Sequence, residues 1–227
     1  GCTDTTVGTI TIYPEPNFNF TAAPDSGCSP LSVRFPSVVG AVNYQWDFGD
    51  GGSASGPTPT HTFINNTTNN RIDTVRLIAR NSFGCFDTSY ANVLIFPNPT
   101  SLFTLDTNRG CQPLPINITN NSIGATSFSW DFGDSTFSDT SDATFIKTYT
   151  NNSAFSRTNT IRLITETDNG CRDTSSRSVE VYPFIDARFT SDTIGCSPLR
   201  IRFTNTSVGA PTSGYFWDFG DTQSSVD

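Results

Sequence analysis

Hydrophobic and polar residues alternate in short runs along the chain. Tyr44, Trp46 and Phe48 occupy alternate positions, with Gln45 and Asp47 between them. A period of two with large side chains on one face is typical of a half-buried β-strand. Because three aromatic rings carry too much apolar surface to remain in water, we expect this face to lie in a core.

The same pattern ends in the five-residue motif Trp-Asp-Phe-Gly-Asp, which occurs three times. The copies begin at Trp46, Trp130 and Trp217, at nearly constant spacing, which predicts a tandem array of repeats. We expect the tryptophan to be buried, the glycine to turn the backbone and the second aspartate to accept hydrogen bonds from turn amides. The residues of this core and turn motif are Trp46, Asp47, Gly49, Asp50, Trp130, Asp131, Gly133, Asp134, Trp217, Asp218, Gly220 and Asp221.

Other segments recur with the same spacing and define the domain organisation. Gly-Cys-x-Asp-Thr occurs three times, followed each time by an alternating run that ends in an aromatic residue and a proline. We therefore predict that 1–16 is the last strand of a preceding repeat and that 17–97 and 98–183 are complete repeats. Residues 184–227 would be the first part of a further repeat, with an open sheet edge and an uncovered aromatic face. The chain is thus expected to be a fragment of a longer protein.

One further run predicts a long strand in the first repeat. From Ile72 to Ala79, Val75 and Leu77 share one parity, and we expect them to point inward. About seven short strands separated by turns are typical of a β-sandwich.

The motif at Trp46 is followed by Pro59-Thr60-His61-Thr62-Phe63, and this combination resembles the PKD domain. That family is an immunoglobulin-like β-sandwich of roughly 80 to 90 residues. The resemblance implies an all-β fold of tandem immunoglobulin-like (PKD) β-sandwiches. The junctions at 13–16, 96–99 and 182–184 are short and contain proline, so we expect stiff spacers and an extended rod.

Composition narrows the class of protein. The formal net charge is −8, and the 13 basic residues are scattered, so we expect no nucleic-acid partner. Without an apolar run of 18 residues, we do not expect the chain to be inserted in a membrane. Six regularly spaced cysteines favour an oxidising compartment, and we expect an extracellular or cell-surface location.

Each complete repeat contains two cysteines, one before the second strand and one at the turn before the last strand. In an immunoglobulin-like sandwich these two positions can lie at the same end. We therefore predict the disulfides Cys28–Cys85 and Cys111–Cys171. Cys2 and Cys196 would pair with cysteines outside the fragment. Metal binding is the alternative, but these cysteines are dozens of residues apart and form no CxxC pair.

Few residues suggest catalysis or ligand binding. His61 is the only histidine, and it could be a general base or metal ligand, or a strand-edge residue of the fold. Its equivalent in the second repeat is Lys147, which cannot act as a general base or metal ligand in the same way, so we expect no enzyme activity. Asp47 and Asp50 could form a weak Ca²⁺ site, although a calcium loop needs six or more oxygen ligands. We expect no other cofactor.

Asn-x-Ser/Thr triplets allow N-glycosylation. They begin at Asn65, Asn117, Asn151 and Asn205. Most such triplets are expected by composition in a chain rich in asparagine and threonine.

Taken together, these patterns favour a structural protein. We expect a stalk or fibre segment of a secreted or cell-surface adhesin, which holds a terminal module away from the cell. The Gly-Cys-x-Asp-Thr endings combined with PKD motifs resemble repeat arrays of large surface adhesins in gliding bacteria. Its partners would be other repeats of the same chain, surface glycans or proteins, or like chains in a fibre. The alternative is a carbohydrate- or protein-binding accessory module of an extracellular enzyme, with Phe86, Phe137 and Phe155 as exposed aromatic residues.

Overall fold

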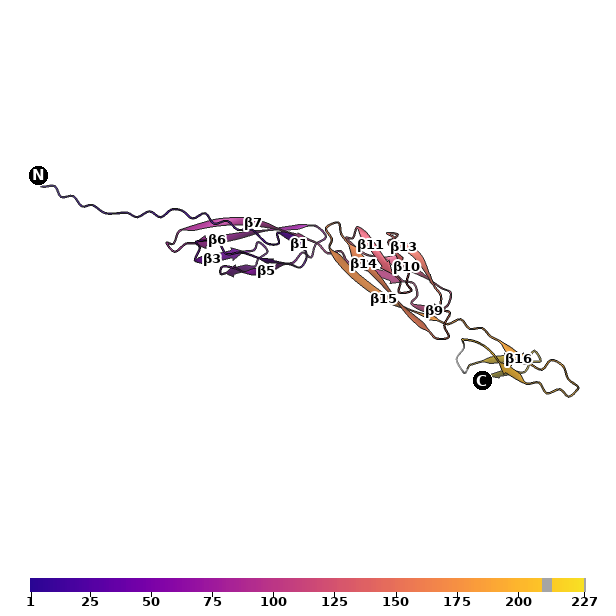
Figure 1. Cartoon of the computed structure of the whole chain (residues 1–227). Coiled ribbons are helices and arrows are strands. Elements are labelled where there is room, and N and C mark those ends of the chain that lie inside the picture. The colour runs from indigo at the N-terminus through magenta and orange to yellow at the C-terminus, as the bar shows by residue number, and fades with distance from the viewer. Residues whose placement is uncertain (210–213, 227) are drawn as a thin grey trace. The chain divides into compact units, whose positions relative to one another are not determined.

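The computed structural model describes residues 1–209 and 214–226, and these residues form strands, turns and loops (Figure 1). Two compact units divide the chain. The first contains Gly1–Pro99 together with Glu166–Arg172, and the second contains Thr100–Thr165 and Asp173–Asp227. In the described residues, no helix has the length and apolar character needed to cross a membrane.

The first unit is a sandwich of a large and a small sheet (Figure 1). The large sheet has the order β1-β7-β6-β3-β4, and the small sheet pairs β2 with β5. These strands are β1 (Ser26–Cys28), β2 (Leu31–Arg34), β3 (Asn43–Asp47), β4 (Ser53–Ser55), β5 (Thr60–Phe63), β6 (Arg71–Arg80) and β7 (Phe86–Phe96).

Alternation along the strands places the core of the first unit between its two sheets. Trp46 and Phe48 are 2% and 1% exposed, so the predicted aromatic face is confirmed as a core face. The long strand predicted over Ile72–Ala79 is β6, in which Val75 and Leu77 are fully buried, as expected. Phe63 of the small sheet packs into the same cluster.

The second unit contains a sandwich whose large sheet has the same strand order. Its large sheet runs β9-β15-β14-β11-β12, and its other sheet runs β13-β10-β8. Trp130 is fully buried there, as Trp46 is in the first unit. The strands are β8 (Phe103–Leu105), β9 (Arg109–Cys111), β10 (Leu114–Asn120), β11 (Ser127–Asp131), β12 (Phe137–Ser138), β13 (Thr144–Tyr149), β14 (Arg157–Glu166) and β15 (Arg172–Tyr182). The all-β, immunoglobulin-like sandwich fold is therefore confirmed.

The described residues from 184 to 226 contain two separate strand pairs. One pair joins β16 (Phe189–Ser191) to β17 (Phe203–Asn205), and the other joins β18 (Phe216–Asp218) to β19 (Ser224–Val226). Phe189, Phe203 and Phe219, whose rings contact Trp217, are 58%, 38% and 39% exposed, so the aromatic face of this segment is uncovered, as the sequence predicted.

Residues 1–16 have no strand partner in the described structure, so their assignment to the last strand of a preceding repeat stays a prediction. The described structure has no strand before β1, although Tyr13 stacks on Phe83 with ring centroids 4.0 Å apart. The physical reason is that a β-strand needs a neighbouring strand to pair its backbone amides and carbonyls.

Candidate functional site

The Trp-Asp-Phe-Gly-Asp motif leads from β3 into a tight turn. The indole Nε1 of Trp46 donates a hydrogen bond to the carbonyl of Gly56 at 3.0 Å, which satisfies its buried polar atom. Gly49 has a φ of 81°, and a Cβ at this position would lie 2.6 Å from the carbonyl oxygen of Thr74. Glycine is therefore required both for the left-handed backbone and for the close approach to β6.

Asp50 joins this turn to the strand that contains His61. Its Oδ1 accepts the amide of Gly52 at 2.9 Å, and its Oδ2 lies 2.7 Å from Nε2 of His61. The imidazole also stacks on the ring of Phe48, with centroids 4.0 Å apart. Burial raises the pKa of Asp50, but the hydrogen bonds from His61 and Gly52 outweigh it and hold that pKa below its usual value. The pair fixes β5 against the turn.

The second repeat has a lysine at the position of His61. Nζ of Lys147 lies 2.8 Å from Oδ2 of Asp134 and 4.9 Å from the ring centroid of Phe132. Burial raises the pKa of Asp134, but hydrogen bonds from Lys147 and Thr136 hold it below its usual value. Lys147 thus makes the ion pair that His61 makes in the first repeat. This equivalence supports the interpretation of His61 as a structural residue, because side chains of different chemistry contact the aspartate from the same position.

The third copy of the motif forms the same local turn. Oδ1 of Asp218 accepts the amide of Gly220 at 2.9 Å, and Oδ1 of Asp221 accepts the amide of Gln223 at 3.0 Å. In the second copy, Oδ1 of Asp131 accepts the amide of Gly133 at 2.9 Å. The turn is therefore specified locally, since it forms even where the surrounding sandwich is incomplete.

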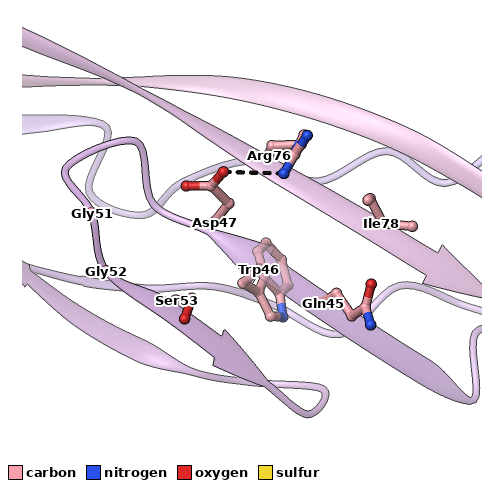
Figure 2. A pocket seen from close by; sticks show the side chains of 8 residues that line it. All are labelled: Gln45, Trp46, Asp47, Gly51, Gly52, Ser53, Arg76 and Ile78. Carbon is pink, nitrogen blue, oxygen red and sulfur yellow. Dashed lines mark hydrogen bonds and ion pairs between the residues drawn. The ribbon is translucent and has the colours of Figure 1, made fainter.

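Asp47 and Asp50, the candidate Ca²⁺ ligands, are already engaged by other side chains. Arg76 contacts Oδ2 of Asp47 at 3.1 Å at the edge of a shallow pocket on the outer face of the sheet (Figure 2). His61 holds Oδ2 of Asp50. In the described chain, no three residues among histidine, cysteine, aspartate and glutamate lie close enough to hold a metal together. These residues do not fit a Ca²⁺ ion, which needs six or more oxygen ligands.

The predicted disulfide pairing is wrong. Within the described residues, Cys28 is bonded to Cys171, with their Cα atoms 5.5 Å apart, and Cys85 and Cys111 are free thiols. Cys28 belongs to the first repeat by sequence, and Cys171 belongs to the second. The turn 166–172 that carries Cys171 is part of the first compact unit.

Strand register explains why the pairing within one repeat fails. The parallel pair of β1 and β7 places Cys28 opposite Phe96, the last residue of β7, whereas Cys85 directly precedes its first residue. Eleven strand residues span roughly 35 Å, far beyond the roughly 7 Å between Cα atoms that a disulfide allows. Cys111 lies opposite Tyr182 at the end of β15 and is separated from Cys171 in the same way. Each predicted pair would therefore have to span the length of a strand.

Two of the possible glycosylation sites are buried structural residues. The Nδ2 of Asn65 donates to the carbonyls of Asn69 and Ile95 at 2.8 and 2.9 Å, and its Oδ1 accepts the amide and hydroxyl of Thr67. Asn151 makes the equivalent contacts in the second repeat. The side chains are 5% and 2% exposed, so the folded protein has no room for a glycan on either. Here the Asn-x-Ser/Thr pattern specifies a loop.

The aspartate of Gly-Cys-x-Asp-Thr has a long-range role that the sequence did not reveal. Oδ2 of Asp87 accepts the amide of Phe18 at 2.7 Å, and Oδ2 of Asp173 accepts the amide of Ser101 at 2.8 Å. Asp87 also accepts the amide of its neighbour Thr88. Each aspartate therefore attaches the opening segment of its own repeat to the last strand.

Comparison with known proteins agrees with the fold. Residues 14–95 match the family model described as PKD domain. Domains of this family are typical of extracellular and surface proteins, which is consistent with a surface or extracellular module. Among curated proteins, none matches this chain.

Similar solved structures include two PKD domains from bacteria. The PKD1 domain of the Vibrio cholerae metalloprotease PrtV is 24% identical, with a TM-score of 0.30, and covers 37% of this chain and 96% of its own. The PKD1 domain of Vibrio anguillarum Epp is also 24% identical, with a TM-score of 0.30, and covers 38% and 95%. Murine CEACAM1b is 8% identical, with a TM-score of 0.32, and covers 73% and 100%.

Proposed function

We propose that this chain is a stalk segment of a secreted or cell-surface protein, in which tandem PKD-like repeats space a terminal adhesive module from the cell. The observation that carries the proposal is the disulfide between Cys28 and Cys171, which ties one repeat to the turn of the next. A covalent bond of this kind, added to a short proline junction such as 96–99, restricts bending at the joint. A spacer that bends little at its joints keeps the terminal module at a fixed distance from the cell.

The distribution of side chains supports a non-catalytic role. The one histidine is paired with Asp50, and a lysine replaces it in the second repeat. The repeated aspartates are committed to turns and ion pairs. We therefore propose that the segment has no enzyme activity and that its partners are other repeats, surface glycans or proteins, or like chains in a fibre.

Small-angle X-ray scattering of the oxidised chain tests the stalk. We expect a maximum dimension that corresponds to repeats arranged end to end and changes little with salt concentration. The C28S variant is the matched comparison, because it removes the bond at the joint and leaves the core residues of both sandwiches unchanged. A compact particle for the oxidised wild-type chain would overturn the proposal.

Location at the cell surface requires a separate test. Intact cells of the natural source would be treated with a protease that does not enter them, and fragments of 17–183 would be measured in the supernatant by mass spectrometry. Release from intact cells supports a surface stalk. Protection until the cells are lysed would contradict it.

A second candidate function is carbohydrate binding on the outer face of β7. Phe86 and Tyr90 lie on the same strand and are 56% and 62% exposed. Both point away from the core of the first unit. Arg80 lies over the ring of Phe86 at 5.3 Å and, together with Arg76, offers hydrogen-bond donors beside the aromatic rings. Aromatic faces and planar donors are the groups that recognise sugar rings. A glycan array probed with wild type and with an F86A/Y90A variant tests this function, and equal absence of binding would exclude it.

A further inference from the structure

The turn that carries Cys171 has an equivalent in the first repeat, where it carries the free thiol of Cys85. The first residue of each turn donates its amide to the carbonyl of the cysteine at 2.9 Å, from Thr167 to Cys171 and from Asn81 to Cys85. The glycine before each cysteine has a positive φ, of 79° and 87° respectively. The backbone therefore presents Cys85 in the geometry that Cys171 has in the disulfide.

The strand end that carries Cys28 has an equivalent in the second repeat, where it carries the free thiol of Cys111. Cys28 lies opposite Phe96 in the parallel pair of β1 and β7, and Cys111 lies opposite Tyr182 in the parallel pair of β9 and β15. The amide after each cysteine donates to the carbonyl of that opposite residue, at 3.0 and 3.4 Å. Cys111 is exposed, so a second thiol can reach it.

We propose that the disulfide between Cys28 and Cys171 is one copy of a cross-link that recurs between successive repeats. Each cross-link has two unlike halves, a strand-end cysteine and a turn cysteine. Cys111 is a free strand-end half, and Cys85 is a free turn half. Cys111 bonds the turn cysteine of a repeat that follows the second, and Cys85 bonds the strand-end cysteine of a repeat that precedes the first. The ligand of each thiol is thus the complementary cysteine of another repeat of this type. That repeat belongs either to the same polypeptide or to a second copy of this chain.

Bond formation requires an oxidant. Two thiols lose two protons and two electrons when the S–S bond forms, and a low-molecular-weight disulfide accepts them as it is reduced to two thiols by exchange. Bonds between like halves are not expected, because two strand-end cysteines or two turn cysteines do not reproduce the arrangement seen for Cys28 and Cys171. The inference deepens the stalk proposal by specifying what locks each joint, and the two can fail separately.

The first arm of the test asks whether a second copy supplies the complementary half. The full chain with C2S/C196S substitutions would be equilibrated in oxidised and reduced glutathione over a range of protein concentrations and mapped by mass spectrometry without reduction. If the partner is a second copy, covalent dimers will increase with concentration and contain Cys85–Cys111 peptides. Dimers that contain Cys85–Cys85 and Cys111–Cys111 as abundantly would overturn the proposal.

The second arm asks whether a following repeat in the same chain supplies the cysteine that bonds Cys111. A duplicate of 98–183 would be inserted between residues 183 and 184 of the C2S/C196S chain. We expect Cys111 of the original second repeat to bond the turn cysteine of the inserted repeat and to lose its reactivity toward maleimide. The matched control carries C111S in the original repeat, and its inserted turn cysteine should then react.

The two arms together decide the proposal. An unlike-half bond in the first arm identifies a second copy as the source, and a bond in the second arm identifies the same chain. If Cys111 remains reactive in both arms while the Cys28–Cys171 peptide is recovered, the cross-link is unique to one joint and the proposal is wrong. Scattering that still shows an extended particle would in that case leave the stalk function standing.

Discussion

Cys28 is bonded to Cys171, which lies 143 residues further along the chain, although each has a cysteine within its own repeat that is nearer in sequence. The bond connects the end of β1 with the turn between β14 and β15. Both ends of the bond belong to the first compact unit, which includes 166–172.

Removal of this bond should lower stability strongly. In the chain-entropy model, a closed loop of this length contributes about 5 kcal/mol. We expect C28S and C171S to lower the melting temperature of the oxidised protein to that of the reduced wild type. C85S and C111S are the controls, because both residues are free thiols in the monomer. Equal losses from all four variants would contradict the assignment.

Replacement of His61, the residue that pairs with Asp50, by lysine should preserve stability. His61 and Lys147 occupy equivalent positions in the two repeats, so H61K should retain the ion pair with Asp50. H61A should lose about 1 kcal/mol in the free energy of unfolding, because the partly buried carboxylate then lacks a side-chain partner. Urea unfolding monitored by tryptophan fluorescence measures both. A larger loss for H61K than for H61A would show that the imidazole has a specific role.

The same ion pairs predict sensitivity to acid. The pKa values of Asp50 and Asp134 are lower in the folded protein than the ordinary value of 3.8 that applies on unfolding. Their contribution is therefore present above about pH 4 and is lost as the pH falls through the folded pKa values. We expect the free energy of unfolding to decrease below pH 4, and to decrease less steeply in D50N/D134N. Parallel curves for the variant and wild type would refute this.

Gly49 should tolerate no side chain. An alanine there has an unfavourable positive φ and a Cβ that would lie 2.6 Å from the carbonyl oxygen of Thr74. We expect G49A to cost about 3 kcal/mol, since strain and overpacking add. G51A is the matched control, with a φ of 96° and no atom within 4 Å of the added Cβ. It should lose only about 1 kcal/mol by thermal unfolding; similar losses would mean that the contact is relieved by a small shift.

Asn65 should matter for folding more than an exposed asparagine in an equivalent triplet. N65A removes hydrogen bonds to the buried carbonyl of Ile95, to the carbonyl of Asn69 and to Thr67, and we expect a loss of about 3 kcal/mol. N117A, which removes an exposed contact to Asp106, should lose less than about 1 kcal/mol. Comparison of denaturant midpoints measures the difference. If N117A were the more damaging change, the loop at Asn65 would not be the structural element described above.

Local pattern was enough to predict much of the fold. The burial of Trp46 and Trp130, the inward face of β6 and the turn at Gly49 all follow from side chains within a few residues of each other. A period of two assigns a face without reference to any partner strand. The turn amides likewise find the aspartate two residues earlier in the chain, as at Asp47 and Gly49.

The tertiary structure decided everything that depends on which strand lies beside which. The sequence placed two cysteines in each complete repeat, but the parallel register of β1 against β7 puts Cys28 and Cys85 at opposite ends of an eleven-residue strand. The sequence marks Asn65 as a possible glycosylation site, whereas the structure shows that its side chain donates a hydrogen bond to the carbonyl of Ile95. Lys147 and His61 differ in chemistry, but the structure places both beside the aspartate of the equivalent turn. Pairing, burial and charge compensation are contacts between distant residues, and only the folded chain specifies their geometry.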